Sequence, residues 1–182
     1  MAGRAAGAPA GAIVVDMGAG ATVVCRMTSE PPGERDMVIV PGGGDAIDLN
    51  LLERLRLKLP NGEFTISGMR DLKERYGCLL DSDSALVGLP VAGRTAPVDV
   101  AESVAAASRA PLATILQAVK SLWPEGRNQA VTVVLAGCGG QLPGLELMLA
   151  EGLKTLGGGK VMRVPDPVFA GAEGALARTV HN

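Results

Sequence analysis

The sequence predicts an α/β protein in which a mixed, five-stranded sheet is flanked by helices. Three observations support this prediction: a β-rich stretch between 12 and 41, an amphipathic helical repeat from 45 to 59, and a buried strand, glycine loop and helix between 130 and 156. Aromatic residues make up only 2% of the chain, whereas it contains 25 Gly and 12 Pro, so aliphatic residues must build the core. This composition suits a layered α/β protein better than a β-sandwich.

The amino-terminal stretch predicts three antiparallel strands, because its apolar runs are joined by short connections. We expect these strands at 12–16, 21–27 and 36–40. The first connection holds one carboxylate, two glycines and one hydroxyl, from Asp16, Gly18, Gly20 and Thr22. A hairpin of this kind is able to present backbone N–H groups to a phosphate and an acid to the accompanying magnesium ion. This turn is therefore the first candidate for a binding site.

A glycine turn then leads into an amphipathic helix. Asp45 is a good N-cap, and large aliphatic side chains recur at every fourth position up to Pro60. These side chains are Ile47, Leu51, Leu55 and Leu59. Periodicity weakens between 61 and 98, where we expect a small α+β insertion. Its elements are a helix over 67–76, a strand near 85–89 and a polar turn at 93–95.

The rest of the chain alternates helices with strands. Asp99 and Glu102 have the spacing of a capping box and begin a helical region that reaches Trp123, with a break expected at Ala110–Pro111. The later elements are a strand at 130–136, a glycine loop at 137–140, a helix near 144–156, a strand at 160–164 and a small-residue helix at 171–178. We therefore expect one unit over 12–182 after a flexible segment at 1–11.

Charge and composition exclude several classes of function. Seventeen basic and nineteen acidic residues give a formal charge of −2 without a Lys/Arg cluster, so no nucleic-acid surface is expected. The three cysteines lack CxxC spacing, which indicates neither a disulfide framework nor a zinc site and favours a cytoplasmic protein. No signal peptide or transmembrane segment is expected. His181 is the only histidine and lies at the chain end, which disfavours a Ser/His/Asp or Cys/His catalytic set.

The order of the glycine-bearing motifs resembles that of the actin-like ATPase superfamily, over about 13 to 180. The motifs are Asp16-Met17-Gly18-Ala19-Gly20-Ala21-Thr22, Gly43-Gly44-Asp45-Ala46-Ile47-Asp48, Lys73-Glu74, Ala136-Gly137-Cys138-Gly139-Gly140 with Pro143-Gly144-Leu145, and Asp166-Pro167 with Gly171-Ala172 and Gly174-Ala175. The resemblance implies an RNase H-like lobe equivalent to the C-terminal half of that fold. Subdomain IIA would comprise 12–60 and 99–182, and subdomain IIB would be the insertion at 61–98. Within the superfamily the chain is most similar to bacterial filament proteins of the MreB and MamK type.

The resemblance also implies roles for individual residues around ATP or ADP with magnesium. Asp16 would hold a magnesium-bound water and would be the one catalytic candidate. The other residues implied are Gly18, Ala19, Gly20 and Thr22 at the phosphates, Gly44 beside them, Gly137, Cys138 and Gly139 beneath the adenosine, and Lys73 and Glu74 over its base and ribose. Simpler readings exist: Asp16 could merely end a strand, and Lys73-Glu74 could be a solvated helix face.

Departures from the family pattern limit the expected activity. Where bacterial filament proteins have Thr-Thr-Asp or Thr-Thr-Glu, this chain has Ala21-Thr22-Val23, so one hydroxyl and one carboxylate near the attacking water are absent. Cys138 replaces a glycine, and its Cβ would press on whatever lies on that backbone, which predicts weak nucleotide binding. The first lobe, which supplies the other phosphate loop and the polar residue that orients water, has no counterpart here. We therefore expect little or no turnover by this chain alone.

Three hypotheses about function follow from the resemblance. The first is an interaction protein, a nucleotide-binding lobe that binds or modulates a full-length actin-like filament, or self-associates, in the cytoplasm and in magnetosome organisation. The second is an ATPase completed by a first lobe on another chain. The third is a fragment without function.

Overall fold

The computed structural model describes residues 8–28, 32–80, 84–123, 130–173 and 176. Its main sheet has the strand order β3-β2-β1-β6-β7. The strands are β1 (Ile13–Met17), β2 (Ala21–Arg26), β3 (Met37–Pro41), β6 (Val131–Ala136) and β7 (Gly159–Arg163). β1, β2 and β3 pair antiparallel, whereas β6 pairs parallel with β1 and β7 pairs parallel with β6. The predicted five-stranded mixed sheet is therefore confirmed.

Successive residues of a β-strand point to opposite faces of the sheet, so each face presents its own set of side chains. The helices pack on the apolar side chains of the sheet. The α-helices are α2 (Gly44–Lys58), α3 (Ile66–Tyr76), α4 (Val100–Ser121) and α5 (Leu145–Leu153), with short 3₁₀ turns η1 (Glu34–Asp36), η2 (Cys138–Gln141) and η3 (Lys154–Leu156). Ile13, Val15 and Met17 of β1 pack into the large core formed with these helices. Val14 and Asp16 alternate with them, and Val14 belongs to a smaller apolar cluster on the other face of the sheet.

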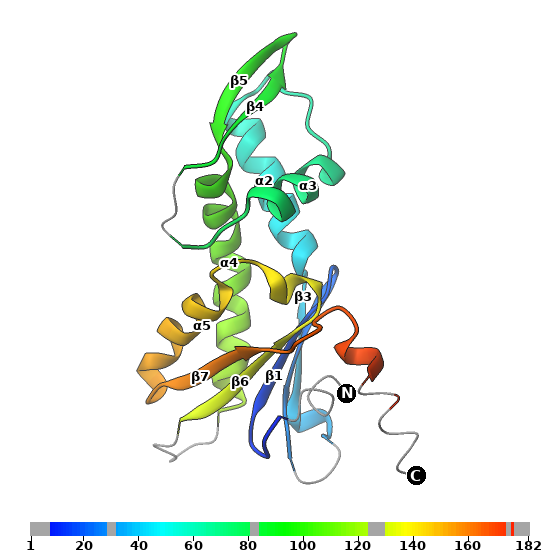
Figure 1. Ribbon diagram of the computed structural model, residues 1–182, viewed down its shortest axis with the longest axis vertical. Coiled ribbons are helices and arrows are strands. Elements are labelled where there is room, and N and C mark those ends of the chain that lie inside the picture. The colour runs from blue at the N-terminus through cyan, green and yellow to red at the C-terminus, as the bar shows by residue number, and fades with distance from the viewer. Residues whose placement is uncertain (1–7, 29–31, 81–83, 124–129, 174–175, 177–182) are drawn as a thin grey trace.

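A second sheet of two strands lies at the end of the molecule away from the main sheet, and α2 and α4 run between the two (Figure 1). Its strands are β4 (Leu86–Val91) and β5 (Arg94–Asp99). The strand predicted near 85–89 corresponds to β4, whereas β5 was not predicted, because Arg94, Thr95 and Pro97 lack the apolar pattern of a strand. Ala92 and Gly93 form the turn, both with positive φ (48° and 73°), which is the backbone conformation of a tight two-residue hairpin.

The helix break expected at Ala110–Pro111 is wrong, because α4 continues through Pro111. Proline has no N–H, so the carbonyl oxygen of Ala107, four residues earlier, loses its helical donor. The side-chain amide of Asn50 on α2 donates to this oxygen at 3.0 Å instead. A tertiary hydrogen bond thus compensates for the missing helical one, and it joins the two helices that cross from one sheet to the other.

The structure of the two chain ends agrees only in part with the expectations from the sequence. Two residues of the expected flexible segment are held in place: the Gly11 N–H donates to the carbonyl oxygen of Met27, just after β2, at 2.7 Å, and Ala8 packs on the smaller apolar cluster. At the other end, a helix begins at Ala170 and is described to Glu173 and again at Leu176. The remainder of the helix expected over 171–178 lies outside the described residues, as does His181. Within the described part, no helix combines the length and apolar character that a bilayer crossing requires.

Candidate functional site

The turn between β1 and β2 packs directly on the start of α2. The N–H groups of Gly44 and Asp45 donate to the carbonyl oxygens of Gly18 and Ala19, at 3.0 and 2.9 Å. Helix α2 is thereby capped by backbone from the turn, and the expectation that Asp45 would be its N-cap is wrong: Gly43 has that position without a side-chain cap. A side chain at Gly43 would collide with the Gly18 carbonyl, so this approach requires glycine.

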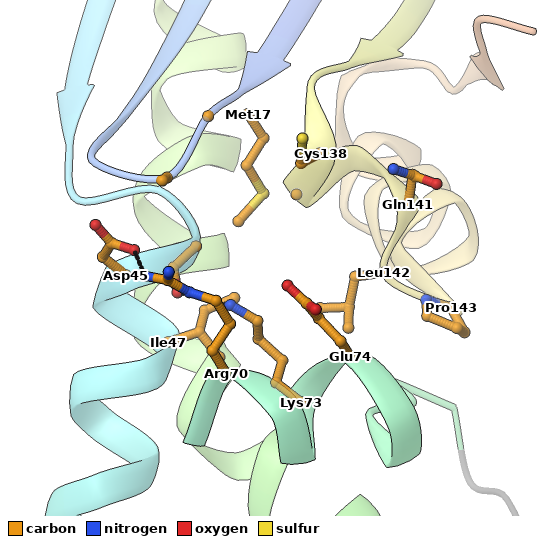
Figure 2. Close-up of a pocket in the computed structure, with 14 residues that line it drawn as sticks. Met17, Asp45, Ile47, Arg70, Lys73, Glu74, Cys138, Gln141, Leu142 and Pro143 are labelled. Carbon is orange, nitrogen blue, oxygen red and sulfur yellow. Dashed lines mark hydrogen bonds and ion pairs between the residues drawn. The ribbon is translucent and has the colours of Figure 1, made fainter. Parts of the chain in front are cut away.

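A cavity of about 640 Å³ opens between this turn, α3 and the glycine loop after β6 (Figure 2). Its volume is that of a small-molecule binding site. The residues from the sequence prediction that line it are Gly18, Ala19, Gly44, Lys73, Glu74, Cys138 and Gly139, joined by Met17, Asp45, Ile47, Arg70, Gln141, Leu142 and Pro143. The hairpin turn and the glycine loop, more than a hundred residues apart in the sequence, therefore share one cavity.

Four predicted residues lie outside this lining, namely Thr22, Gly20, Gly137 and Asp16. Thr22 is fully buried on the helical side of β2, and its hydroxyl has no hydrogen-bond partner within the described chain, so the structure does not bring it to the cavity. Gly20 is exposed at the tip of the turn. Gly137 has a positive φ of 77°, and its N–H donates to the carbonyl oxygen of Pro167 at 2.9 Å. Gly137 thus fixes the path of the loop rather than offering a free N–H group.

Asp16 also lies outside the lining, on the opposite side of β1 from the large core. A Cβ placed on Gly137 would be 2.6 Å from one of its carboxylate oxygens, and one placed on Gly171 would be 4.0 Å from the other. The carboxylate is half-buried, has no hydrogen-bond or ion-pair partner in the described part of the chain, and has a pKa raised by that burial. A partly desolvated, unpaired carboxylate is unfavourable by itself, and a cation would relieve it.

The surroundings of Asp16 fit a magnesium ion that is held mainly by other ligands. In the ranges that the structure describes, no three His, Cys, Asp or Glu side chains gather to hold a metal by themselves. Magnesium usually keeps several waters and binds through one or two carboxylates together with phosphate oxygens. A single carboxylate beside glycines, where no side chain blocks water or phosphate, is consistent with this mode of binding.

Lys73 and Glu74 differ sharply although they are neighbours on α3. The Lys73 side chain is only 13% exposed; its ammonium lies 2.6 Å from the fully buried carboxylate of Asp48 and donates to the Gly44 carbonyl at 3.1 Å. The reading of Lys73 as a solvated helix face therefore does not hold. Glu74 is exposed, and its carboxylate points into the cavity (Figure 2).

Arg70 and Asp48 are site residues that the sequence reading did not select. The Arg70 guanidinium lies 2.9 Å from Asp45 and 3.4 Å from Asp48, and its hydrogen bond to Asp48, together with both carboxylate charges, raises its pKa. A signal was present in the sequence. Asp45 and Asp48 are three residues apart, as are Arg70 and Lys73, and this spacing places each pair on one helix face. That α2 and α3 pack with these two faces toward each other was not predictable from the sequence.

Cys138 lies in the cavity wall and is exposed, whereas Cys25 and Cys78 are half-buried. Next to it, a Cβ on Gly139 would strike the side chain of Met17. The loop backbone therefore packs closely on β1 at Gly139, while the Cys138 side chain remains accessible.

Comparisons with known proteins agree with this geometry. No family model matches the chain. Among curated proteins it is similar to the actin-like protein MamK of Paramagnetospirillum magneticum, 29% identical over 170 residues that cover 90% of this chain and 49% of that protein. MamK of Magnetospirillum gryphiswaldense is likewise 29% identical over 170 residues, covering 90% of this chain and 47% of that protein. The chain spans about half the length of the curated relatives it matches.

Solved structures give the same result. A MamK double helical filament matches with a TM-score of 0.91 and 27% identity, covering 100% of this chain and 57% of that one. A non-polymerising MamK mutant bound to AMPPNP matches with a TM-score of 0.86 and 26% identity over the same shares of the two chains. MreB 5 of Spiroplasma citri, bound to AMPPNP, shares the fold at a TM-score of 0.76 and 16% identity, covering 99% of this chain and 57% of that one.

Proposed function

Because this chain belongs to the actin-like ATPase superfamily, we propose that it is a nucleotide-binding lobe that interacts with, or modulates, an actin-like filament. The main support is that the β1–β2 turn, the glycine loop and α3 meet around one cavity, beside which the Asp16 carboxylate lies next to Gly137 with no partner among the described residues. We assign the lobe to the C-terminal half of the actin-like fold, with 61–98 as subdomain IIB. The proposed location is the cytoplasm, on a filament and at magnetosomes.

The proposed ligand is ATP or ADP with magnesium, which when bound would neutralise phosphate charge. The Gly18–Gly20 backbone would face the phosphates, and Asp16 would hold a water of the metal. Gly139 and Cys138 would lie under the nucleoside, and the Glu74 carboxylate would accept from its ribose hydroxyls. The Lys73 ammonium is already engaged, so Lys73 would contribute its alkyl chain to the cavity wall.

Weak hydrolysis is part of this proposal. Asp16 pairs across the sheet with Val23, and because Thr22 points into the core, Ala21 and Val23 face the same side as Asp16. Neither side chain is able to orient a water molecule. Positioning of that water accounts for much of the rate in phosphoryl transfer, so the bound triphosphate should persist on this lobe.

Alkylation of Cys138 offers a test of nucleotide binding. We expect magnesium with AMPPNP to slow the reaction of Cys138 with iodoacetamide several-fold, because the ligand would cover the exposed thiol in the cavity wall. Peptide mass spectrometry follows each cysteine separately. Cys25 and Cys78, being half-buried, provide internal controls whose rates should not change. Equal rates for Cys138 at saturating ligand would contradict binding in this cavity.

Co-sedimentation with a full-length MamK filament tests the interaction. A lobe with about half of a protomer should present one usable end, and a filament grows only through two complementary ends, so we expect the lobe to shorten filaments or reduce polymer in proportion to its amount. An Asp16→Asn variant, deficient in nucleotide, indicates whether the effect depends on the ligand. Filaments of unchanged length and amount at a large excess of lobe would argue against this function.

The alternative is an ATPase completed by a first lobe on another chain. The exposed apolar residues Met37 and Ile39 on the edge strand β3 favour a partner for this part of the sheet. Steady ATP turnover after mixing with such a lobe, abolished by Asp16→Ala, would support this alternative. A lobe that binds neither nucleotide nor filament would be a fragment without function.

A further inference from the structure

A buried carboxylate joins the two helices that border the cavity. Asp48 of α2 is fully buried, and both cations near it come from α3: the Lys73 ammonium at 2.6 Å and the Arg70 Nε at 3.4 Å. The lysine contact is close but poorly directed for a hydrogen bond, so it acts as an ion pair. Because α3 also bears Glu74, the Asp48 contacts fix the distance of Glu74 from the rest of the cavity.

The same lysine reaches the turn that is proposed to face the phosphates. Lys73 Nζ donates to the carbonyl oxygen of Gly44 at 3.1 Å, and the Gly44 N–H donates to the carbonyl oxygen of Gly18 at 3.0 Å. A side chain at Gly44 would come within 3.3 Å of this ammonium, and a side chain at Gly43 would strike the turn. A continuous series of contacts thus runs from the turn through Gly44 and Lys73 to Asp48.

The series connects two ends of one cavity that are distant in the sequence. A ligand that fixes the Gly18 carbonyl also fixes Gly44, and through it the ammonium that holds α3. If a ligand at the phosphate end orders α3, the nucleoside binds to a helix that is already ordered. Nucleoside binding then costs less conformational entropy.

We infer that Asp48 and Lys73 form a positioning pair that couples the phosphate end of the cavity to its nucleoside end. The inference rests on the proposed function and concerns its regulation: the phosphate content of the ligand sets how tightly the nucleoside is held. Asp48 touches no ligand itself and acts through Lys73.

The coupling is measurable with two halves of the ligand. Adenosine is titrated into the intact chain with and without saturating magnesium tripolyphosphate, and NMR chemical shifts give the affinity. We expect tripolyphosphate to raise adenosine affinity about fivefold or more, a typical coupling between sites. In Asp48→Asn and in the double variant Asp48→Asn/Lys73→Gln, the factor should fall to about one. The double variant leaves no unpaired buried charge, which protects folding.

Glu102→Gln is the matched control. It removes the exposed ion pair between Glu102 of α4 and Lys58, which lies on α2 as Asp48 does. It should keep the wild-type coupling factor. A role in stability alone would lower both affinities in the Asp48 variants and leave their ratio intact, and that result would overturn the inference. Binding of both probes to the wild-type chain without coupling would also overturn it while leaving the proposed function in place. If neither probe binds to the wild-type chain, both the inference and the proposed function are wrong.

Discussion

Lys73→Met is expected to lower the free energy of unfolding by about 3–5 kcal/mol, because it leaves the buried Asp48 carboxylate without its closest cation. Asp48 is fully buried and Lys73 is 13% exposed, so solvent does not replace the lost partner. Arg70, at 3.4 Å from Asp48 and shared with Asp45, offers partial compensation and favours the lower end of that range. Urea denaturation followed by circular dichroism measures the change.

Glu74→Gln is the matched control on the adjacent residue. Glu74 is exposed and directed into the cavity, so we expect its replacement to change stability by less than about 0.5 kcal/mol while weakening adenosine binding. Lys73→Met should therefore lower stability, whereas Glu74→Gln should lower adenosine affinity. Equal losses of stability in both variants would show that the Lys73–Asp48 contact is not a buried ion pair in solution.

Asp16→Asn should have two opposite effects. Magnesium-dependent nucleotide affinity should fall by about tenfold to a hundredfold, the usual effect of removing a group that holds a metal-bound ligand. In the absence of nucleotide the same variant should unfold at a higher temperature at pH 7, because burial disfavours the charged carboxylate. Calorimetry with and without magnesium AMPPNP measures both effects.

The pH dependence follows from the raised pKa of Asp16. The folded state binds its proton more tightly than the unfolded chain, so the stabilising contribution of the neutral form is complete below the unfolded value near 3.8. It is lost as pH rises through the higher folded pKa. Stability should therefore decline across that interval in the wild-type chain, and Asp16→Asn should remove the decline.

Asp71→Asn provides the control for Asp16→Asn, since Asp71 is an exposed carboxylate on α3. It should leave the magnesium-dependent affinity unchanged. If Asp16→Asn destabilises the ligand-free chain at pH 7, the carboxylate has a stabilising structural partner, and its assignment to a cation site would be wrong.

Much of the main sheet could be predicted because its strands are short, apolar and separated by strong turns. β1 and β2 were found to within a residue or two, since Ile13–Val15 and Val23–Val24 flank two glycines. β5 was missed because its polar residues and Pro97 obscure the pattern. Local signals therefore suffice where burial makes a strand apolar, and they fail for an exposed hairpin.

The errors at the helices have a common cause in tertiary contacts. The side chain of Asn50 satisfies the carbonyl that Pro111 leaves free, and backbone from the β1–β2 turn caps α2 in place of Asp45. Neither partner is near in sequence. The burial of Thr22 could have been inferred from strand alternation with Val24, whereas the pairing of Lys73 with Asp48 required knowledge of how α3 packs on α2.

The binding of magnesium AMPPNP is tested most directly by NMR on the isotope-labelled chain. We expect the backbone amide signals of the turn at 18–20, the loop at 137–139 and Glu74 to shift together and to saturate with one binding constant, while those of α5 stay in place. Shifts confined to another surface, or none at millimolar ligand, would contradict the claim that these segments form one nucleotide site.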